Sequence, residues 1–328
     1  MDFGAARRSS SPFDDTILPD NISPETVKHS WRADLSLMAT ALMWGANILV
    51  FKDGIGRIDP WVFNAVRLVL ATLTLSILAA LEAKIYPMPA INTSERPANY
   101  YQRVLAFSFL SGFLYLITFV RAIDLTTAGN TALILASMPM WTAILSMVFL
   151  RERLPQITWI GLLVTFIGTV IVTTRSSGAV SLSSQFFVGN LLMLLASLAW
   201  AAATVMSKPL LNWISPLRLA AVSAALTTPL HIALVATQLP SAIPEILQPA
   251  TLAGIVYSGV CSTGIAYALW HAGVRAVGGS HAAVYQNVVT LVAVIGGWVV
   301  LRETPMFAQV LGGCLTICGL LLMRRGRR

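Results

Sequence analysis

Residues 128–172 read AGNTALILASMPMWTAILSMVFLRERLPQITWIGLLVTFIGTVIV, and residues 279–323 read GSHAAVYQNVVTLVAVIGGWVVLRETPMFAQVLGGCLTICGLLLM. The second stretch repeats the pattern of the first after a shift of 151 positions. Each contains an apolar run of about twenty residues, a Leu-Arg-Glu break and a second apolar run. A helix of about twenty residues is ~30 Å long, which matches the hydrocarbon core of a bilayer. We therefore predict a pair of membrane helices that occurs twice.

The composition of the whole chain is that of an integral membrane protein. Of its 328 residues, 56% are hydrophobic and 11% are charged, whereas a soluble domain carries about 25% charged residues. The net charge of +8 is better explained by membrane topology than by nucleic-acid binding, because four of the arginines lie together at the C-terminal end. The three cysteines fall within predicted membrane helices, so we expect no disulfide framework.

The chain divides into a tail and two similar halves. Residues 1–33 are polar and contain several prolines, which predicts a disordered cytoplasmic tail. Residues 34–174 and 187–323 each hold five apolar runs. Their first helices also match, after a shift of 156 positions: Trp44, Lys52 and Pro60 recur as Trp200, Lys208 and Pro216. Because five is odd, consecutive copies enter the membrane from opposite sides. The predicted fold class is an all-α integral membrane protein with ten transmembrane helices as two inverted five-helix repeats.

Basic residues predict how the chain is oriented in the membrane. Short cytoplasmic loops carry an excess of Lys and Arg. With the N-terminus inside, fifteen basic residues fall on the cytoplasmic side and five on the opposite side. We therefore expect a multi-pass protein of the cytoplasmic (inner) membrane with both the N- and the C-terminus in the cytoplasm.

Several motifs resemble those of the EamA-type branch of the drug/metabolite transporter superfamily. They are Trp-Gly-Ala-Asn at 44–47, Arg67, the segment 122–129, Pro139, the doubled Leu-Arg-Glu and the paired glycines of helices five and ten. Each motif is loose, but their order and doubled spacing are specific, and they cover residues 36–323. The resemblance implies a ten-helix, two-repeat carrier for small metabolites, often an exporter of amino acids or related compounds. The second copy departs from the first, with Thr290 for Pro139, Ser223 for Arg67 and His281 for Asn130.

Arg67 is the first candidate for substrate binding. It lies about two turns into the predicted second helix, where an unpaired cation is expensive in hydrocarbon. A guanidinium that faces the protein interior can bind a carboxylate or phosphate through two parallel hydrogen bonds. The alternative is a structural position, in which Arg67 contacts Asn64 or a backbone carbonyl, and the sequence leaves both readings open.

Polar and aromatic residues of three further helices are the other candidates. In helix four, Asn130, Ser137 and Trp141 share one face. Uncompensated amides do not face lipid, so the helix that contains Gln286 has a protected side. Together with Arg67, the expected substrate-binding residues are Asn130, Ser137, Trp141, Tyr267, Trp270, His281, Tyr285 and Gln286. Such a polar and aromatic lining suits an amphipathic small molecule, although an aromatic residue taken alone more often serves packing or anchors a helix at the membrane interface.

The Leu-Arg-Glu breaks and the glycines have simpler explanations. Arg302 and Glu303 stand where helix nine leaves the membrane, and we expect a charged stop with a local ion pair, with a gate latch as the alternative. Gly161 and Gly168 recur at heptad spacing on one helix face, as do their repeats Gly312 and Gly319. Small residues let membrane helices approach closely, so these glycines predict helix packing.

Several chemistries lack the residues that they need. All fourteen acidic residues lie in tails, loops or helix ends, which argues against a carboxylate proton relay and favours passive or exchange-driven transport. His281, and after it His271 and His231, could titrate inside the fold. No third ligand stands near His271 and His281 at metal-binding spacing, so we expect no metal and no cofactor.

The sequence therefore predicts a carrier rather than an enzyme, with a zwitterionic or monoanionic metabolite such as an amino acid as its small-molecule partner. The other expected partner is the lipid bilayer, and we expect no nucleic acid. The sequence is compatible with a monomer and does not fix the oligomeric state. The alternatives are a carrier of phosphorylated or nucleotide-linked metabolites or drugs, a channel, a structural membrane partner and an intramembrane enzyme. An enzyme would need a nucleophile, base or metal set that the sequence does not show.

Overall fold

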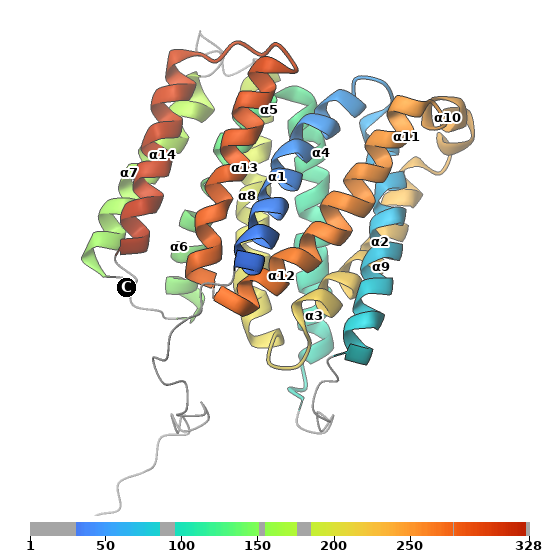
Figure 1. Cartoon of the computed structure of the whole chain (residues 1–328), viewed down its shortest axis with the longest axis horizontal. Coiled ribbons are helices and arrows are strands. Elements are labelled where there is room, and N and C mark those ends of the chain that lie inside the picture. Colours follow the sequence, from blue (N-terminus) through green and yellow to red (C-terminus); the bar gives the residue numbers. More distant parts are fainter. Residues whose placement is uncertain (1–30, 86–95, 151–154, 176–184, 278, 326–328) are drawn as a thin grey trace, which may run out of the picture.

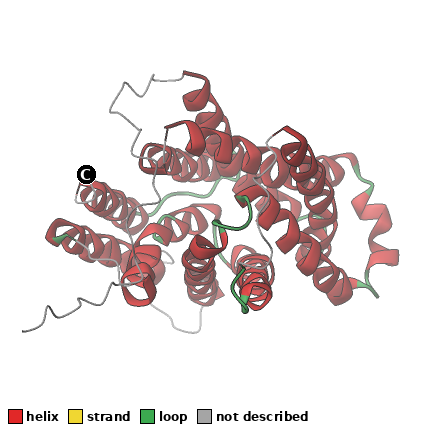
Figure 2. Ribbon diagram, turned by 90° about the horizontal axis from the view of Figure 1, so that it is seen from below, coloured by secondary structure: helices red, strands yellow, loops and turns green. Residues whose placement is uncertain are grey.

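The computed structural model of the chain describes residues 31–85, 96–150, 155–175, 185–277 and 279–325, and the regular structure in those ranges is helical (Figures 1 and 2). Within them, the side chains of 150, 173–175, 274–277, 279–284, 286, 287, 324 and 325 are outside the description. The first half comprises α1 (Trp31–Gly54), α2 (Pro60–Ile85), α3 (Tyr100–Ser108), the π-helix η2 (Phe109–Leu114), α4 (Tyr115–Leu125), α5 (Ala128–Leu135), α6 (Met138–Leu150) and α7 (Gln156–Arg175). The second comprises α8 (Gln185–Leu210), α9 (Pro216–Val235), α10 (Leu239–Ile246), α11 (Pro249–Val256), the π-helix η3 (Tyr257–Ile265), α12 (Ala266–Val277), α13 (Gly279–Val299) and α14 (Phe307–Arg325).

The predicted tail, residues 1–33, lies outside the described residues as far as residue 30, and α1 begins at Trp31. Seven helical segments of the described chain are long and apolar enough to cross a membrane, and three shorter apolar helices join them. These segments correspond to the ten predicted apolar runs. Their outward faces are apolar: Leu73 and Leu163 are 56% and 60% exposed, as suits side chains that face lipid.

Equivalent helices of the two repeats begin in the same way. Pro60 and Pro216 are the first residues of α2 and α9, a position where the missing N–H of proline does no harm. The residue before each proline caps the helix. Asp59 Oδ1 accepts hydrogen bonds from the backbone amides of Trp61 (2.9 Å) and Val62 (3.1 Å), and Ser215 Oγ accepts from that of Arg218 (3.2 Å).

The fourth span differs between the repeats because only the first contains a proline. Pro139 cannot donate a backbone hydrogen bond and its ring clashes with the preceding turn, so the helix breaks at Ala136 and Ser137 into α5 and α6. Thr290 occupies the equivalent position of α13, which runs unbroken from Gly279 to Val299. The substitution noted in the sequence therefore has a direct structural effect.

The two repeats exchange their first helices. In Figure 1, α1 lies beside α13 and α12 of the second repeat, and it also packs against η3. In return, α8 of the second repeat packs against η2, α4, α5 and α6 of the first. This exchange produces two mixed halves: α1 with α11 to α13, and α8 with α3 to α6. Neither repeat therefore packs as a separate bundle.

Equivalent helices also meet directly, α2 with α9 and α7 with α14 (Figure 1). Thr72 Oγ1 and Thr228 Oγ1 form a hydrogen bond of 2.8 Å between α2 and α9. These two residues are separated by 156 positions, which is the repeat shift itself. A residue that contacts its own counterpart lies on a two-fold axis, so the pseudo-two-fold axis of the inverted repeat passes through this pair.

The glycines of α7 and α14 bring these helices together, as predicted. A Cβ atom added at Gly168 would lie 2.5 Å from the carbonyl oxygen of Gly312. One added at Gly161 would lie 2.6 Å from the carbonyl oxygen of Gly319. Both distances are far below van der Waals contact, so only glycine permits this backbone approach.

Each repeat has a π-helix in its third span. Gly112 of η2 packs against α9, where an added Cβ would lie 2.9 Å from Ser223 Oγ. Gly259 of η3 packs against α2, where an added Cβ would lie 2.5 Å from the carbonyl oxygen of Arg67. Because Ser223 is the repeat counterpart of Arg67, the two π-helices occupy equivalent positions. Short π-helical segments are frequent at functional sites and change the backbone hydrogen-bonding pattern there.

We predict that Gly168→Val destabilises the protein, because its side chain would collide with the backbone of α14. Overpacking of this kind costs about 1–3 kcal/mol, which lowers the midpoint of thermal unfolding. The measurement is thermal unfolding of the purified protein, with Ile167→Val as the control because Ile167 is 45% exposed on the same helix. Equal midpoints for the two variants would show that α7 and α14 do not approach as described.

Candidate functional site

Arg67 is buried in the protein interior. It lies on α2 and is 4% exposed. Its Nη2 donates a hydrogen bond to Asn64 Oδ1 at 2.8 Å, and its Nη1 donates to Thr263 Oγ1 of η3 at 3.4 Å. The guanidinium carbon lies 5.0 Å from the ring centroid of Phe51. Two polar groups and one ring face, from three spans, therefore hold this cation.

The cluster continues from Asn64 to the second repeat. Asn64 Nδ2 lies 3.3 Å from His231 Nδ1 of α9, and His231 Nε2 lies 2.9 Å from the carbonyl oxygen of Gly112 in η2. Thr263 Oγ1 donates to the carbonyl oxygen of Ser258, so it is free to accept from Arg67. Both π-helices thus supply backbone carbonyls to the network around Arg67.

Aromatic rings extend from Arg67 toward α8. Phe51 packs edge-on against Phe119, with ring centroids 5.5 Å apart. Phe119 contacts Tyr115 at 5.7 Å, and Tyr115 contacts Trp200 at 4.9 Å. The counterpart of Trp200 is Trp44, whose Nε1 donates to the Ser262 carbonyl oxygen of η3. Each first helix therefore places its tryptophan against the third span of the other repeat.

The charge of Arg67 has no described counter-ion. The ion pairs among the described residues join Arg57 with Asp53, Arg121 with Asp124 and Arg218 with Glu82, all away from Arg67. Its Nε atom is buried without a hydrogen-bond partner. A buried, incompletely bonded guanidinium is costly, and an anion that binds there would relieve that cost.

Asn130 belongs to a second buried network near the end of α4. Its Nδ2 donates to Thr126 Oγ1 at 3.1 Å and to Asn190 Oδ1 of α8 at 3.3 Å. Gln309 Nε2 of α14 donates to Asn130 Oδ1 at 2.6 Å. The network joins α5, α8 and α14, so it links the two repeats at the end of the bundle where α1 terminates in Gly54.

The other predicted site residues form separate contacts. Trp141 Nε1 donates to Ser137 Oγ at 3.1 Å, one turn away in the interrupted fourth span. Tyr267 packs edge-on against His271, with ring centroids 4.6 Å apart. Trp270 packs against Trp44 at 5.2 Å, and Tyr285 Oη donates to Asp34 Oδ1 at 2.9 Å. The side chains of His281 and Gln286 lie outside the described residues.

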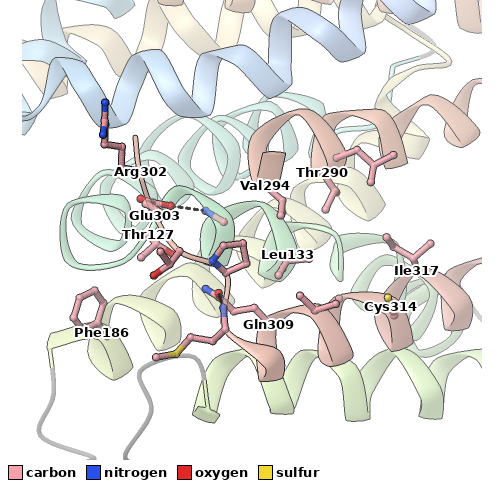
Figure 3. A pocket seen from close by; sticks show the side chains of 17 residues that line it. Thr127, Leu133, Phe186, Thr290, Val294, Arg302, Glu303, Gln309, Cys314 and Ile317 are labelled. Carbon is pink, nitrogen blue, oxygen red and sulfur yellow. Dashed lines mark hydrogen bonds between the residues drawn. The ribbon is translucent and has the colours of Figure 1, made fainter. Parts of the chain in front are cut away.

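Glu303 connects the repeats at the Gly54 end, where a local ion pair was expected. Its Oε1 accepts a hydrogen bond from the amide of Ala128 at 2.9 Å, and its Oε2 accepts from that of Gly129 at 3.2 Å. Figure 3 shows Arg302 directed away from this contact. A carboxylate at the N-terminus of α5 is stabilised by the unpaired amides and the helix dipole. This geometry agrees with the alternative reading, a latch between the repeats.

Two features support the latch. Arg302 has a φ of 58°, a left-handed conformation that turns the chain back after α13. On the other side of the α4–α5 junction, Lys52 Nζ donates to the carbonyl oxygens of Ile123 (2.6 Å) and Thr126 (2.6 Å). A cation thus binds the end of α4 while an anion binds the start of α5. The first copy of the Leu-Arg-Glu break, at 150–152, lies outside the described side chains.

A groove of about 510 Å³ lies beside the latch, between α13 and α14 with α5 as its floor (Figure 3). Leu133, Thr290, Val294 and Ile317 line it, and Glu303 and Gln309 lie at its polar end. Leu291 and Val310 on its rim are 51% and 53% exposed, so the groove opens toward lipid. Arg67 does not line it. Because the buried cation lies elsewhere, we place the candidate site at Arg67 and not in the groove.

Sequence reasoning identified Arg67 and named Asn64 as its structural alternative, but it ranked His231 behind His281. The signal for His231 was weak, because one histidine in an apolar helix does not reveal which residue of a distant helix it meets. Thr263 and Gln309 were missed for the same reason. No group of three His, Cys, Asp or Glu side chains within the described ranges could hold a metal ion.

Comparisons with known proteins find membrane transporters that match both halves of the chain. The model of the EamA-like transporter family matches residues 31–174 and 187–325. The uncharacterized transporter YetK of Bacillus subtilis is 25% identical over 297 residues, which cover 90% of this chain and 87% of YetK. An uncharacterized transporter of Archaeoglobus fulgidus is 26% identical over 293 residues, which cover 89% of this chain and 96% of that relative. A crystal structure with 16% sequence identity covers 88% of this chain and 95% of its own at a TM-score of 0.58, which shows a shared fold.

We predict that Glu303→Gln weakens the latch, because an amide keeps one acceptor but loses the charge at the start of α5. The expected loss is about 0.3–2 kcal/mol, measured as a lower midpoint of thermal unfolding in the purified protein. Arg302→Gln is the matched control in the same turn, and it should change the midpoint little. If both variants unfold like the parent protein, Glu303 does not hold the repeats together.

Proposed function

This chain belongs to the EamA-like transporter family and is a multi-pass membrane transporter, and on that premise we propose that it is a secondary carrier for a zwitterionic or monoanionic metabolite, such as an amino acid. The observation that carries the proposal is the buried Arg67 with an unpartnered Nε and no described counter-ion. We propose that the carboxylate of the solute provides the missing charge.

The number of cations supports a solute with one negative charge. Lys52 is engaged with the end of α4, and Arg67 is the one Lys or Arg whose side chain is fully buried among the described residues. Arg96 and Arg218 also have an unpartnered Nε, but these two residues are only half-buried. Phosphorylated or nucleotide-linked solutes carry two or more charges and would call for more than one such group. Beside Arg67 lie the rings of Phe51 and Phe119, which are buried in this structure, and we propose that the apolar part of the solute packs against them.

The exchanged repeats support transport by alternating access. In carriers with inverted repeats, one half rocks against the other around a site near the middle of the membrane. Here the α1 half contains η3 and the α8 half contains η2, and the Arg67 network touches both π-helices. The Glu303 latch joins the same halves at the Gly54 end. We propose that this latch opens when the solute site faces that side.

We propose that the Gly54 end faces the outside of the cytoplasmic membrane and that both termini are cytoplasmic, on the basis of the basic-residue asymmetry. In a background without Cys261, Cys314 and Cys318, a membrane-impermeant maleimide applied to intact cells should label Gln248→Cys. It should reach Tyr101→Cys, which is 69% exposed at the opposite end, only after permeabilisation. The reverse labelling pattern would contradict the proposed orientation.

We predict that Arg67→Gln weakens binding of the solute's free acid by about ten- to hundredfold, because one charge-assisted contact is worth about 1.5–3 kcal/mol. Binding of the corresponding amide, which lacks the carboxylate, should change little. Both ligands can be titrated into the purified protein after a thermal-shift screen of amino acids has identified a binder. Arg67→Lys is the matched variant, since it keeps the charge but not the two-point contact.

Equal losses for acid and amide would remove Arg67 from the solute site. That outcome, together with a lower unfolding midpoint in the absence of ligand, would mean that Arg67 serves the fold through Asn64 and Thr263. Transport that fails to saturate with concentration would favour a channel over a carrier.

A further inference from the structure

The hydrogen bonds between Arg67 and η2 form a chain whose direction is fixed at both ends. A guanidinium only donates hydrogen bonds, and a backbone carbonyl oxygen only accepts them. Arg67 Nη2 is 2.8 Å from Asn64, and the carbonyl oxygen of Gly112 is 2.9 Å from His231 Nε2. Asn64 and His231 stand between these ends and can each both donate and accept.

One assignment satisfies the whole chain. Asn64 must turn its carbonyl oxygen toward Arg67, which leaves its amide nitrogen facing His231 Nδ1 at 3.3 Å. An amide nitrogen only donates, so Nδ1 must accept and carries no proton. His231 is therefore neutral, with its proton on Nε2, which donates to Gly112. A charged imidazolium, a donor at both nitrogens, would leave Asn64 facing a donor on either side.

The imidazole is closely enclosed. His231 is 2% exposed, and its ring lies 5.4 Å from the ring of Phe113. A buried ring with both nitrogens bonded has one orientation, and it transfers that orientation to the Asn64 amide. The repeat shift of 156 positions gives Ala220 and Ser223 of the second repeat as the counterparts of Asn64 and Arg67, and Leu75 of the first repeat as the counterpart of His231. The chain of hydrogen bonds therefore exists on one side of the pseudo-two-fold axis.

We propose that His231 is a positioning residue for the solute anchor: through Asn64 it fixes the Arg67 guanidinium so that the Nε–H stays unpartnered and available to the solute. This inference rests on the proposed role of Arg67. Without the imidazole acceptor, the Asn64 amide can rotate and present its nitrogen to Arg67. Arg67 Nη2 would then lose its acceptor, and the guanidinium would turn to find another.

Two variants separate positioning from packing. His231→Gln supplies one acceptor and one donor, so it can take the places of Nδ1 and Nε2. His231→Leu fills the space but supplies neither. Both should be prepared as full-length protein in lipid nanodiscs, with nitrogen-15 in histidine and arginine. Thermal unfolding measured without ligand shows whether each variant is folded.

The first measurement needs no solute. The histidine ring signal that disappears in His231→Gln belongs to residue 231, and it should report a neutral ring protonated at Nε2. The Arg67 Nε signal, assigned by its loss in Arg67→Lys, should shift in His231→Leu and stay near its parent position in His231→Gln. A charged imidazolium or a proton on Nδ1 of His231 would overturn the proposal. So would an Arg67 Nε signal at the same position in the parent protein, His231→Leu and His231→Gln.

The second measurement uses L-leucine as the probe and leucinamide as the control without a carboxylate. His231→Leu should weaken leucine binding about tenfold relative to leucinamide, and His231→Gln should restore it to within about twofold of the parent. Equal loss in both variants would overturn positioning. If the parent protein does not bind leucine, the proposed function fails for that solute, and the ring and guanidinium signals still decide the inference.

Discussion

A guanidinium inside a membrane needs hydrogen-bond acceptors that hydrocarbon cannot supply, and the centre of this protein is organised around that need. Asn64 and Thr263 accept from Arg67, and the ring of Phe51 covers one face. Thr263 belongs to η3, and the chain through His231 ends on a carbonyl of η2. The two π-helices therefore serve the cation as well as their own packing, η2 against α9 and η3 against α2. Among the described residues, no acidic side chain forms an ion pair with Arg67, and the proposed function follows from that missing charge.

The inverted repeat explains the scaffold, and the departures from it explain the site. Thr72 meets Thr228 across the pseudo-two-fold axis, and the glycines of α7 and α14 make matching contacts. Arg67, however, has Ser223 as its counterpart, which hydrogen-bonds to Ser111 of η2 at 3.1 Å. Symmetry lets one half rock against the other. In the proposed function, a cation on one side of the axis would give the solute a single orientation.

The sequence predicted the architecture because helix length, repeat shift and an odd number of spans are local or countable properties. It also predicted the close packing at Gly161 and Gly168, since small residues at heptad spacing have one common use in membranes. It did not predict the partner of Glu303, because the amides of Ala128 and Gly129 are contributed by the other repeat. The chain through His231 was hidden for a similar reason: it joins positions 64, 112 and 231 through a π-helix, which has no sequence signature.

We propose that the two mixed halves open alternately at opposite ends around Arg67. Alternating opening is tested most directly by distances between pairs of spin labels, measured by pulsed electron paramagnetic resonance on the protein in lipid nanodiscs. One pair at Gln185 and Gln248 reports the Gly54 end, and one at Trp31 and Leu211 reports the other end. The account predicts two populations, in which the first distance lengthens as the second shortens, and Glu303→Gln should enrich the population open at the Gly54 end. A single distance at each end that is insensitive to Glu303→Gln and to added solute would contradict it.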